Sequence, residues 1–421
     1  MNFFDAVVRA LHKKHGEGSG GSFIMPTIKT EGYAHAGLRQ LLAQERELLI
    51  FDDSLTLPAL DVPYDVVLWN GGLLPRAQHA EFHLTHENPA PLAADTSSFS
   101  DLARALTSTL VVRITASPKT PLSLGWICDA LRPAILCSSL RIEVAGGIQA
   151  SIILEDRALS ENHLHLSSLE LVLEESSSLD CALLANAHAP TSLRGVQATV
   201  HANAKLRMIR TVSPTGRARE EITCEIFEGA HASLRALMVQ KTGHTSLSTR
   251  MVHKEKNASS MQIFRSAVFS GAEVDVDVRT DVAPHASGTS ARQETKHLLM
   301  EEGAKAYTVP RLFIHNDDVV CSHGATMGHA TPELLSYMAT RGIGEQRAKA
   351  LLALGHMAEL AHHLPASCEA NYLASLRSLF QLGSGRHLPT ENIFRFSTPS
   401  KMDCPLSILT LQPPLRNWAR L

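Results

Sequence analysis

Hydrophobic spacing in the first hundred residues is helical only in places. Residues 2–15 carry apolar side chains three or four positions apart, which predicts a short amphipathic helix. Prolines interrupt most of the later pattern, although the stretch 36–49 also predicts a helix. Ser100 is placed to cap a further helix that starts at Asp101. We therefore expect residues 1–100 to form a mixed, partly helical region.

Between residues 101 and 330 apolar and polar side chains alternate in short runs, which predicts β-strands. Asn-Ala or Gly-Ala pairs precede several strands, with Ala204, Ala230, Ala258 and Ala304 spaced 26, 28 and 46 residues apart, the last close to two periods of 23. Such a repeat is typical of a solenoid whose coils stack on one another. The alternative is an antiparallel sandwich, but Asn-Gly and Asp-Gly hairpin turns are absent from this region. We predict a mainly β chain with a parallel β-helix (solenoid) core.

The pattern becomes helical beyond the solenoid. Thr331 can cap a helix that begins at Pro332. Further helices are expected over 344–363 and 367–383, followed by an irregular tail, so residues 331–421 are predicted to form a helical subdomain and tail. The side chains expected to face inward are Ala348, Leu351, Leu352 and Leu360 in the second helix and Leu373, Leu376 and Phe380 in the third.

Composition excludes several classes of protein. A formal charge of −3 over 421 residues gives no basic face for nucleic acid. No apolar run approaches the roughly 18 residues needed to cross a bilayer. At the N-terminus the positive charges come after the apolar stretch, an order that does not suit a secretory signal. The seven cysteines form no C-x-x-C pair and are interpreted as reduced thiols, which predicts a cytoplasmic location.

Two motifs early in the chain have ordinary explanations. The glycines of residues 16–21 match a dinucleotide-binding pattern, but no strand precedes them, so we interpret this stretch as a linker. His79, His83 and His86 have the spacing of metal ligands on a helix. The same segment also alternates as a strand, which is the interpretation we prefer.

Asp275 and Asp277 alternate with valines, as expected for a strand with one face in solvent. Their use as a catalytic pair would make the chain a β-helix enzyme acting on carbohydrate, which is an alternative function. A Walker A loop, a nucleophile elbow and an H-E-x-x-H motif are all absent from the sequence. We therefore predict that the chain is not an enzyme and binds no nucleotide.

The best candidate site lies in the segment 316–326. If this segment is the last strand of the solenoid, Cys321 and His323 project from the same face, about 7 Å apart along the strand. Thiolate and imidazole are preferred ligands of zinc and of iron–sulfur clusters. Two ligands do not complete such a site, so others would come from elsewhere in the chain or from a partner. A structural cysteine and histidine, or a zinc enzyme, are the alternatives.

The stretch 310–328 resembles the signature of the SufB/SufD family of iron–sulfur cluster assembly proteins, in its SufD-type form. The resemblance extends over about residues 290–358. SufB-type sequences place a cysteine on the preceding strand, whereas residues 304–312 contain none, and a SufB-like scaffold is therefore the second choice. The flanking positions that match the family are Gln293, Thr295, Leu298, Leu299, Ala304, Arg341, Gly342, Ile343, Ala348, Leu351 and Leu352.

This resemblance implies a fold, partners and a role. It implies a right-handed parallel β-helix that pairs with a SufB-like paralogue, with a SufC-like ATPase docked on the helices of residues 331–383. It also implies that His323 lies at the interface of the pair, where it would hold a transient iron–sulfur cluster shared with the partner. Cys321 is a second candidate ligand. The chain would then act as a non-catalytic scaffold.

Overall fold

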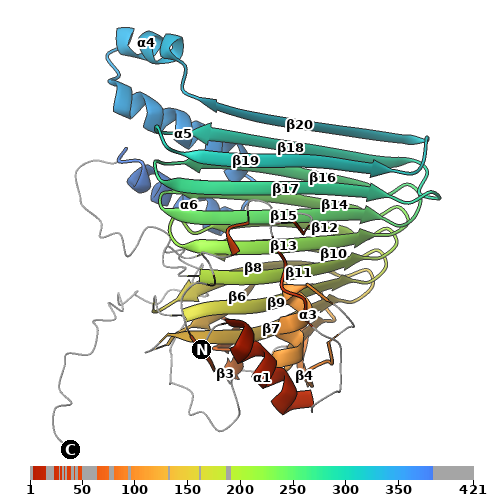
Figure 1. Ribbon diagram of the computed structural model, residues 1–421. Coiled ribbons are helices and arrows are strands. Elements are labelled where there is room, and N and C mark those ends of the chain that lie inside the picture. Colours follow the sequence, from red (N-terminus) through yellow and green to blue (C-terminus); the bar gives the residue numbers. More distant parts are fainter. Residues whose placement is uncertain are drawn as a thin grey trace, which may run out of the picture.

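The chain winds into a parallel β-solenoid with helices at its N-terminal end and on one side (Figure 1). The computed structural model describes residues 3–15, parts of 23–49, 64–74, 80–92 and 96–382 except 131–132, 161–162 and 186–190. The predicted linker at 16–22, His79 and the predicted tail from 384 lie outside these residues. The predicted mainly β, solenoid fold is confirmed, and the sandwich alternative is wrong because nearly all strand pairs along the body are parallel.

Two ten-stranded sheets form the body of the solenoid. The first sheet contains β1 (Glu47–Leu49), β4 (Phe82–Glu87), β5 (Thr109–Ile114), β7 (Ala134–Val144), β9 (His163–Leu173), β11 (Thr191–Val200), β13 (Arg217–Ile226), β15 (Gly243–His253), β17 (Ala272–Val282) and β19 (Lys305–Ile314). The second contains β2 (Val66–Trp69), β3 (Gly72–Leu74), β6 (Leu122–Cys128), β8 (Gln149–Ala158), β10 (Ser178–Ala185), β12 (Lys205–Val212), β14 (His231–Gln240), β16 (Ser259–Val268), β18 (Thr289–Leu299) and β20 (Val319–His329). From β5 onwards successive strands alternate between the sheets, so each coil adds one strand to each.

In-register stacking of the coils creates the core. On β17, Val274, Val276 and Val278 are fully buried and face the solenoid interior, where the apolar side chains of neighbouring coils pack together. The residues between them face outward, because successive side chains of a strand point to opposite faces. The alternation in the sequence therefore reports which side chains enter the interior.

One turn of each coil contains a residue in the left-handed backbone conformation, and these residues stack in a column along the solenoid. The N–H of each residue donates to a carbonyl in the next coil, as from Asn203 to Glu228 (2.8 Å) and from Gly229 to Lys256 (3.1 Å). Glycine and asparagine tolerate this backbone conformation better than other residues. The column consists of Gly147, Ser176, Asn203, Gly229, Asn257 and Gly288, with φ between 56° and 72°.

The column corrects the predicted repeat. After Asn257 the next member is Gly288, 31 residues further on, and not the Gly303-Ala304 pair. Gly303 belongs to a different turn, where its carbonyl accepts from Gly271 (3.4 Å). The 26- and 28-residue intervals are the lengths of two coils, whereas the 46-residue interval is not two periods of 23.

Helices cover part of the N-terminal end. Helix α1 (Phe3–His15) matches the predicted amphipathic helix, and α3 (Phe99–Leu106) packs on the outer face of the first sheet across β7, β9 and β11. Ser98, not Ser100, caps α3 by accepting from the N–H of Asp101 (3.3 Å). Ser100 lies within the helix and contacts Gly195, where any larger residue would collide with it. Much of the predicted helix at 36–49 lies outside the described residues, and its end forms β1.

Three C-terminal helices come after β20: α4 (Pro332–Thr340), α5 (Glu345–Ala361) and α6 (Ala366–Leu379). Thr331 caps α4 as predicted, by accepting from the N–H of Leu334 (3.3 Å). Helices α5 and α6 pack on the outer face of the second sheet, whereas α4 has no buried residue. The predicted inward positions are right for Ala348, Leu360, Leu376 and Phe380, but Leu351, Leu352 and Leu373 are only half-buried; Ala353 and Met357 take the central positions of α5.

The two ends of the solenoid differ. At the N-terminal end the sheets finish with β3 and β4, which pair antiparallel to β2 and β5. At the other end β19 and β20 are the last strands, and among the described residues neither sheet continues beyond them (Figure 1). Within the described chain, no helix combines the length and apolar character needed to cross a bilayer.

Candidate functional site at the open end of the solenoid

Strand β20 is an exposed edge. It pairs with β18 on one side, and nine of its eleven residues are exposed; Val319 and Cys321 are half-buried. In β18, one coil earlier, every second residue from Thr289 to His297 is buried. The same pattern of interior and outer positions is therefore present in β20, but in the part of the chain that the structure describes no further coil covers its interior side.

Cys321 and His323 lie on this uncovered interior side. They are in register with Ala291 and Gln293 of β18, which are 2% exposed and face the solenoid interior. The predicted last strand and shared face are thus confirmed. The Cys321 thiol is half-buried, and burial raises its pKa, with partial opposition from a hydrogen bond to the backbone of Ala291. The His323 imidazole is exposed.

A line of buried polar side chains leads through the interior to this point. Thr249 donates to Gln262 (2.6 Å), and the amides of Gln262 and Gln293 both donate to the Thr280 hydroxyl, at 3.1 and 2.8 Å. The Oε1 atom of Gln293 is buried and has no hydrogen-bond partner among the described residues. Strand register places His323 beside Gln293. A buried acceptor without a donor is costly, so this position favours a donor from His323 or from a ligand.

The pair does not complete a metal site by itself. Among the residues that the structure describes, no three His, Cys, Asp or Glu side chains gather closely enough to hold a metal ion. His83 and His86 lie on β4, where their positions fall on opposite faces of a strand. The helical geometry that their spacing suggested is therefore absent.

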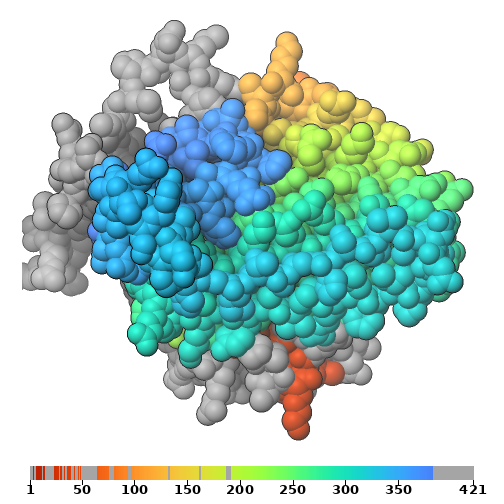
Figure 2. All heavy atoms as spheres, turned by 90° about the horizontal axis from the view of Figure 1, so that it is seen from above, coloured from red at the N-terminus to blue at the C-terminus, as the bar shows by residue number. Residues whose placement is uncertain are grey.

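Apolar side chains surround the site. We use the name open-end surface for the large hydrophobic residues exposed on β19, β20 and α4, and Figure 2 looks onto this end of the molecule. Seven of the ten large hydrophobic residues exposed in the described chain belong to it, so the exposure is concentrated at one end. Its members are Val309, Phe313, Ile314, Val320, Met327, Leu334 and Tyr337, which are between 36% and 74% exposed.

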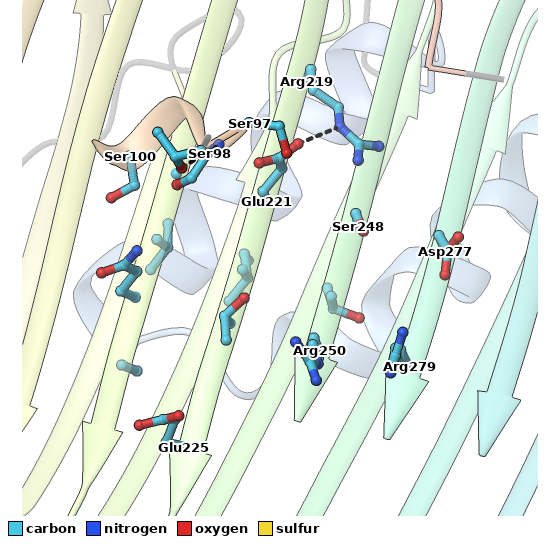
Figure 3. Close-up of a pocket in the computed structure, with 18 of the residues that line it drawn as sticks. Ser97, Ser98, Ser100, Arg219, Glu221, Glu225, Ser248, Arg250, Asp277 and Arg279 are labelled. Carbon is cyan, nitrogen blue, oxygen red and sulfur yellow. Dashed lines mark hydrogen bonds and ion pairs between the residues drawn. The ribbon is translucent and has the colours of Figure 1, made fainter. Parts of the chain in front are cut away.

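A second hollow lies on the outer face of the first sheet, next to the N-terminus of α3 (Figure 3). Its volume is about 720 Å³. Arg219 and Glu221 lie together on β13, with Arg219 also over the ring of Tyr33, which hydrogen-bonds to Glu221. Burial raises the pKa of Glu221 to about 8. Two further arginines of the hollow, Arg250 and Arg279, both form ion pairs with Asp281 of β17.

Asp275 and Asp277 were expected to face solvent on one side of their strand. That expectation is wrong. Asp275 and Asp277 are only 3% and 6% exposed. Asp275 accepts from Ser246 (2.8 Å), and Asp277 forms an ion pair with Arg311 (2.9 Å). They point away from the interior as predicted, but other side chains of the outer face cover them.

By fold and site, the chain is a parallel β-solenoid protein that displays a thiol and an imidazole at an uncapped end. A family model described as SUF system FeS cluster assembly, SufBD core domain, matches residues 129–356, more than half of the chain. The chain therefore belongs to the SufB/SufD family of the SUF iron–sulfur cluster assembly system. The resemblance inferred from residues 310–328 is confirmed.

Individual relatives agree with this assignment. The chain is 34% identical over 116 residues to the iron–sulfur cluster assembly protein SufD of Escherichia coli, which is 28% of this chain and 27% of that protein. It is 28% identical over 153 residues to SufD of Bacillus subtilis, 36% of this chain and 35% of that protein. A SufBD family protein of Staphylococcus epidermidis is 21% identical over 239 residues, 53% of this chain and 51% of the other. The matches thus span about a quarter to a half of each relative.

Proposed function

We propose that this chain is a non-catalytic scaffold subunit that pairs with a SufB-like chain through the β19 and β20 part of the open-end surface. The observation that carries this proposal is β20, an eleven-residue edge strand exposed on both faces. Soluble proteins usually shorten, charge or cover such an edge, because it invites pairing with another chain. Main-chain hydrogen bonds along an edge and the burial of neighbouring apolar side chains are a common way to recognise a partner.

A SufC-like ATPase is the proposed second partner, docked on the helices of residues 331–383. Helix α4 supports this, because it carries Leu334 and Tyr337, 39% and 58% exposed, and buries no residue of its own. The sequence lacks a phosphate-binding Walker A loop, so nucleotide hydrolysis would take place on that partner. The cytoplasmic location remains a prediction that fits this role.

His323, with Cys321 as a second candidate, is proposed to hold the nascent iron–sulfur cluster at the interface with the SufB-like chain. The cluster is cargo here, passed on after assembly. Cys and His are the side chains that bind such clusters, and the remaining ligands would come from the partner. Gln293 supports the role of His323, because its unpartnered Oε1 could fix which imidazole nitrogen carries the proton.

Co-expression with the SufB-like and SufC-like chains tests the partnership. We expect gel filtration with light scattering to give one assembly that contains all three. Migration of this chain alone, with the other two associated without it, would contradict the proposal. A homodimer of this chain that excludes the SufB-like chain would also contradict it, since the same edge would then serve self-association.

Substitution of the imidazole tests the site. His323→Ala should leave the assembly intact and reduce cluster maturation in cells by roughly tenfold or more, as for the loss of a metal ligand or its support. His315→Ala is the matched control, because it removes another exposed imidazole at the same end. Maturation is measured by the activity of a cluster-dependent reporter enzyme. Equal effects of the two variants, or none, would contradict a ligand role for His323.

A further inference from the structure

A small cavity lies where the turn between α5 and α6 meets the outer face of the second sheet. Its volume is about 290 Å³. The floor is formed by β10 and β12, and the wall by residues 362–365 of the helical turn. The acidic, guanidinium and imidazole side chains that line it are Asp180, Arg207, Arg235, His362 and His363. Four of these five are basic, so groups that can carry positive charge predominate around the cavity.

Arg235 is the unusual member. It contacts the Ser233 hydroxyl and the Met261 sulfur (3.7 Å), and it forms no ion pair with any carboxylate among the described residues. Its Nε atom is buried and has no acceptor in the described part of the chain. Arg207, by contrast, is held by both carboxylate oxygens of Asp180. A half-buried guanidinium without a counter-ion is costly to keep, which suggests that its anion comes from outside the chain.

The neighbouring groups report the same excess of positive charge. Burial lowers the pKa of Arg235, and the charge of Arg207 lowers it further. The pKa of His363 is lowered by burial and then by Arg235 and His362. His362 itself pairs with Glu369 (2.5 Å), which lies outside the cavity lining. The cavity therefore combines free volume with an excess of basic groups. Its one carboxylate, Asp180, is already paired with Arg207.

We propose that this cavity binds a phosphate group, with Arg235 as its principal donor and His363 and Arg207 beside it. A guanidinium presents two parallel N–H groups that match phosphate oxygens, and such charge-assisted hydrogen bonds are strong. The volume exceeds that of a single phosphate ion, so a small phosphomonoester fits better than inorganic phosphate. The site lies away from the open-end surface, and its test does not depend on the proposed pairing.

Titration calorimetry on the full chain tests this, with inorganic phosphate and glycerol 3-phosphate as the two probes. We expect saturable binding of both, tighter for the ester, and a phosphate-dependent rise in the melting temperature. Arg235→Gln should weaken binding at least roughly tenfold, because the strongest charged contact is lost. Arg113→Gln is the control, since it removes an equal charge from an arginine paired with Glu143 and Glu174 on the other sheet.

Arg235→Lys guards against an effect on folding. This substitution keeps the positive charge but removes the two parallel N–H donors of the guanidinium. The variant should therefore bind phosphate more weakly than the native chain and more tightly than Arg235→Gln. All variants should retain the native circular dichroism and melt without phosphate at or above the native temperature. The proposal is overturned if the native chain shows no saturable binding at millimolar phosphate, or if Arg235→Gln and Arg113→Gln bind equally.

Discussion

The two ends of the solenoid finish in opposite ways. At the N-terminal end the interior positions are sealed, with Val66, Leu68 and Phe82 at most 4% exposed, and the edge strands are short or polar. At the other end Ile314 and Met327 occupy interior positions and are 39% and 48% exposed. Stacked-coil proteins usually need a cap where the stack stops. The uncapped end is therefore the surface on which we propose that another chain packs.

The strongest test of this difference compares two isoleucines. Ile114 ends β5 and is fully buried, whereas Ile314 ends β19 and is exposed, and both face the interior. Ile114→Ala should lower the free energy of unfolding by roughly 2–5 kcal/mol, because it leaves a cavity in a packed core. Ile314→Ala should lower it by less than about 1 kcal/mol in the single chain. Urea unfolding monitored by circular dichroism measures both.

The second prediction concerns the edge itself. Val320, 74% exposed on the outer side of β20, should be central to pairing but not to folding. Val320→Asp should weaken the SufB-like partner's binding by roughly tenfold or more, because it places a charge in a desolvated interface. Leu159→Asp is the control, since Leu159 is 43% exposed and comes directly after β8 in the first coils. Similar loss in both variants, measured by surface plasmon resonance, would remove the distinction between the ends.

A third prediction contrasts the buried histidines of the solenoid with the exposed His323. Burial lowers the pKa of His165 to about 3 and those of His253 and His297 to about 4. Unfolding exposes them, and their pKa returns to about 6.5. The unfolded chain then binds more protons, so stability is complete above about pH 6.5 and falls as the pH drops towards 4.

Unfolding measured between pH 7 and 4 tests this assignment. His253→Gln should reduce the steepness of the acid loss, whereas the exposed His323→Gln should leave it unchanged. If His323→Gln also alters the steepness, its imidazole is more enclosed in solution than β20 indicates. If neither variant alters the steepness, the buried histidines do not control the loss of stability at acid pH.

Alternation together with the repeated turn pairs was sufficient to predict stacked coils, and alternation alone predicted the shared face of Cys321 and His323. Thr331 directly before Pro332 was sufficient to predict the cap of α4. Alternation failed for Asp275 and Asp277, because it separates inner from outer positions but does not reveal what covers the outer face. On β17 the covering groups come from neighbouring coils, since Asp275 accepts from Ser246 and Asp277 pairs with Arg311. The 46-residue interval misled, since Gly303 belongs to a different turn from Asn203, Gly229 and Asn257.

The open end and the role of Gln293 were harder to foresee. The helical pattern after β20 predicts where the stack stops, but it does not reveal that α5 and α6 pack on the side of the second sheet and leave the last strand uncovered. A signal did exist for the buried polar line, because Thr249, Gln262, Thr280 and Gln293 occupy positions where the alternation calls for apolar residues. Polar residues at interior positions of several successive strands would have identified it.

Hydrogen–deuterium exchange of β20 tests the central claim most directly. In the single chain its amides should exchange faster than those of β18, and addition of the SufB-like chain should protect β19 and β20 while β2 and β3 remain unchanged. Exchange in β20 that does not respond to the partner, in an assembly shown to be intact, would contradict the claim that the open end is the pairing surface.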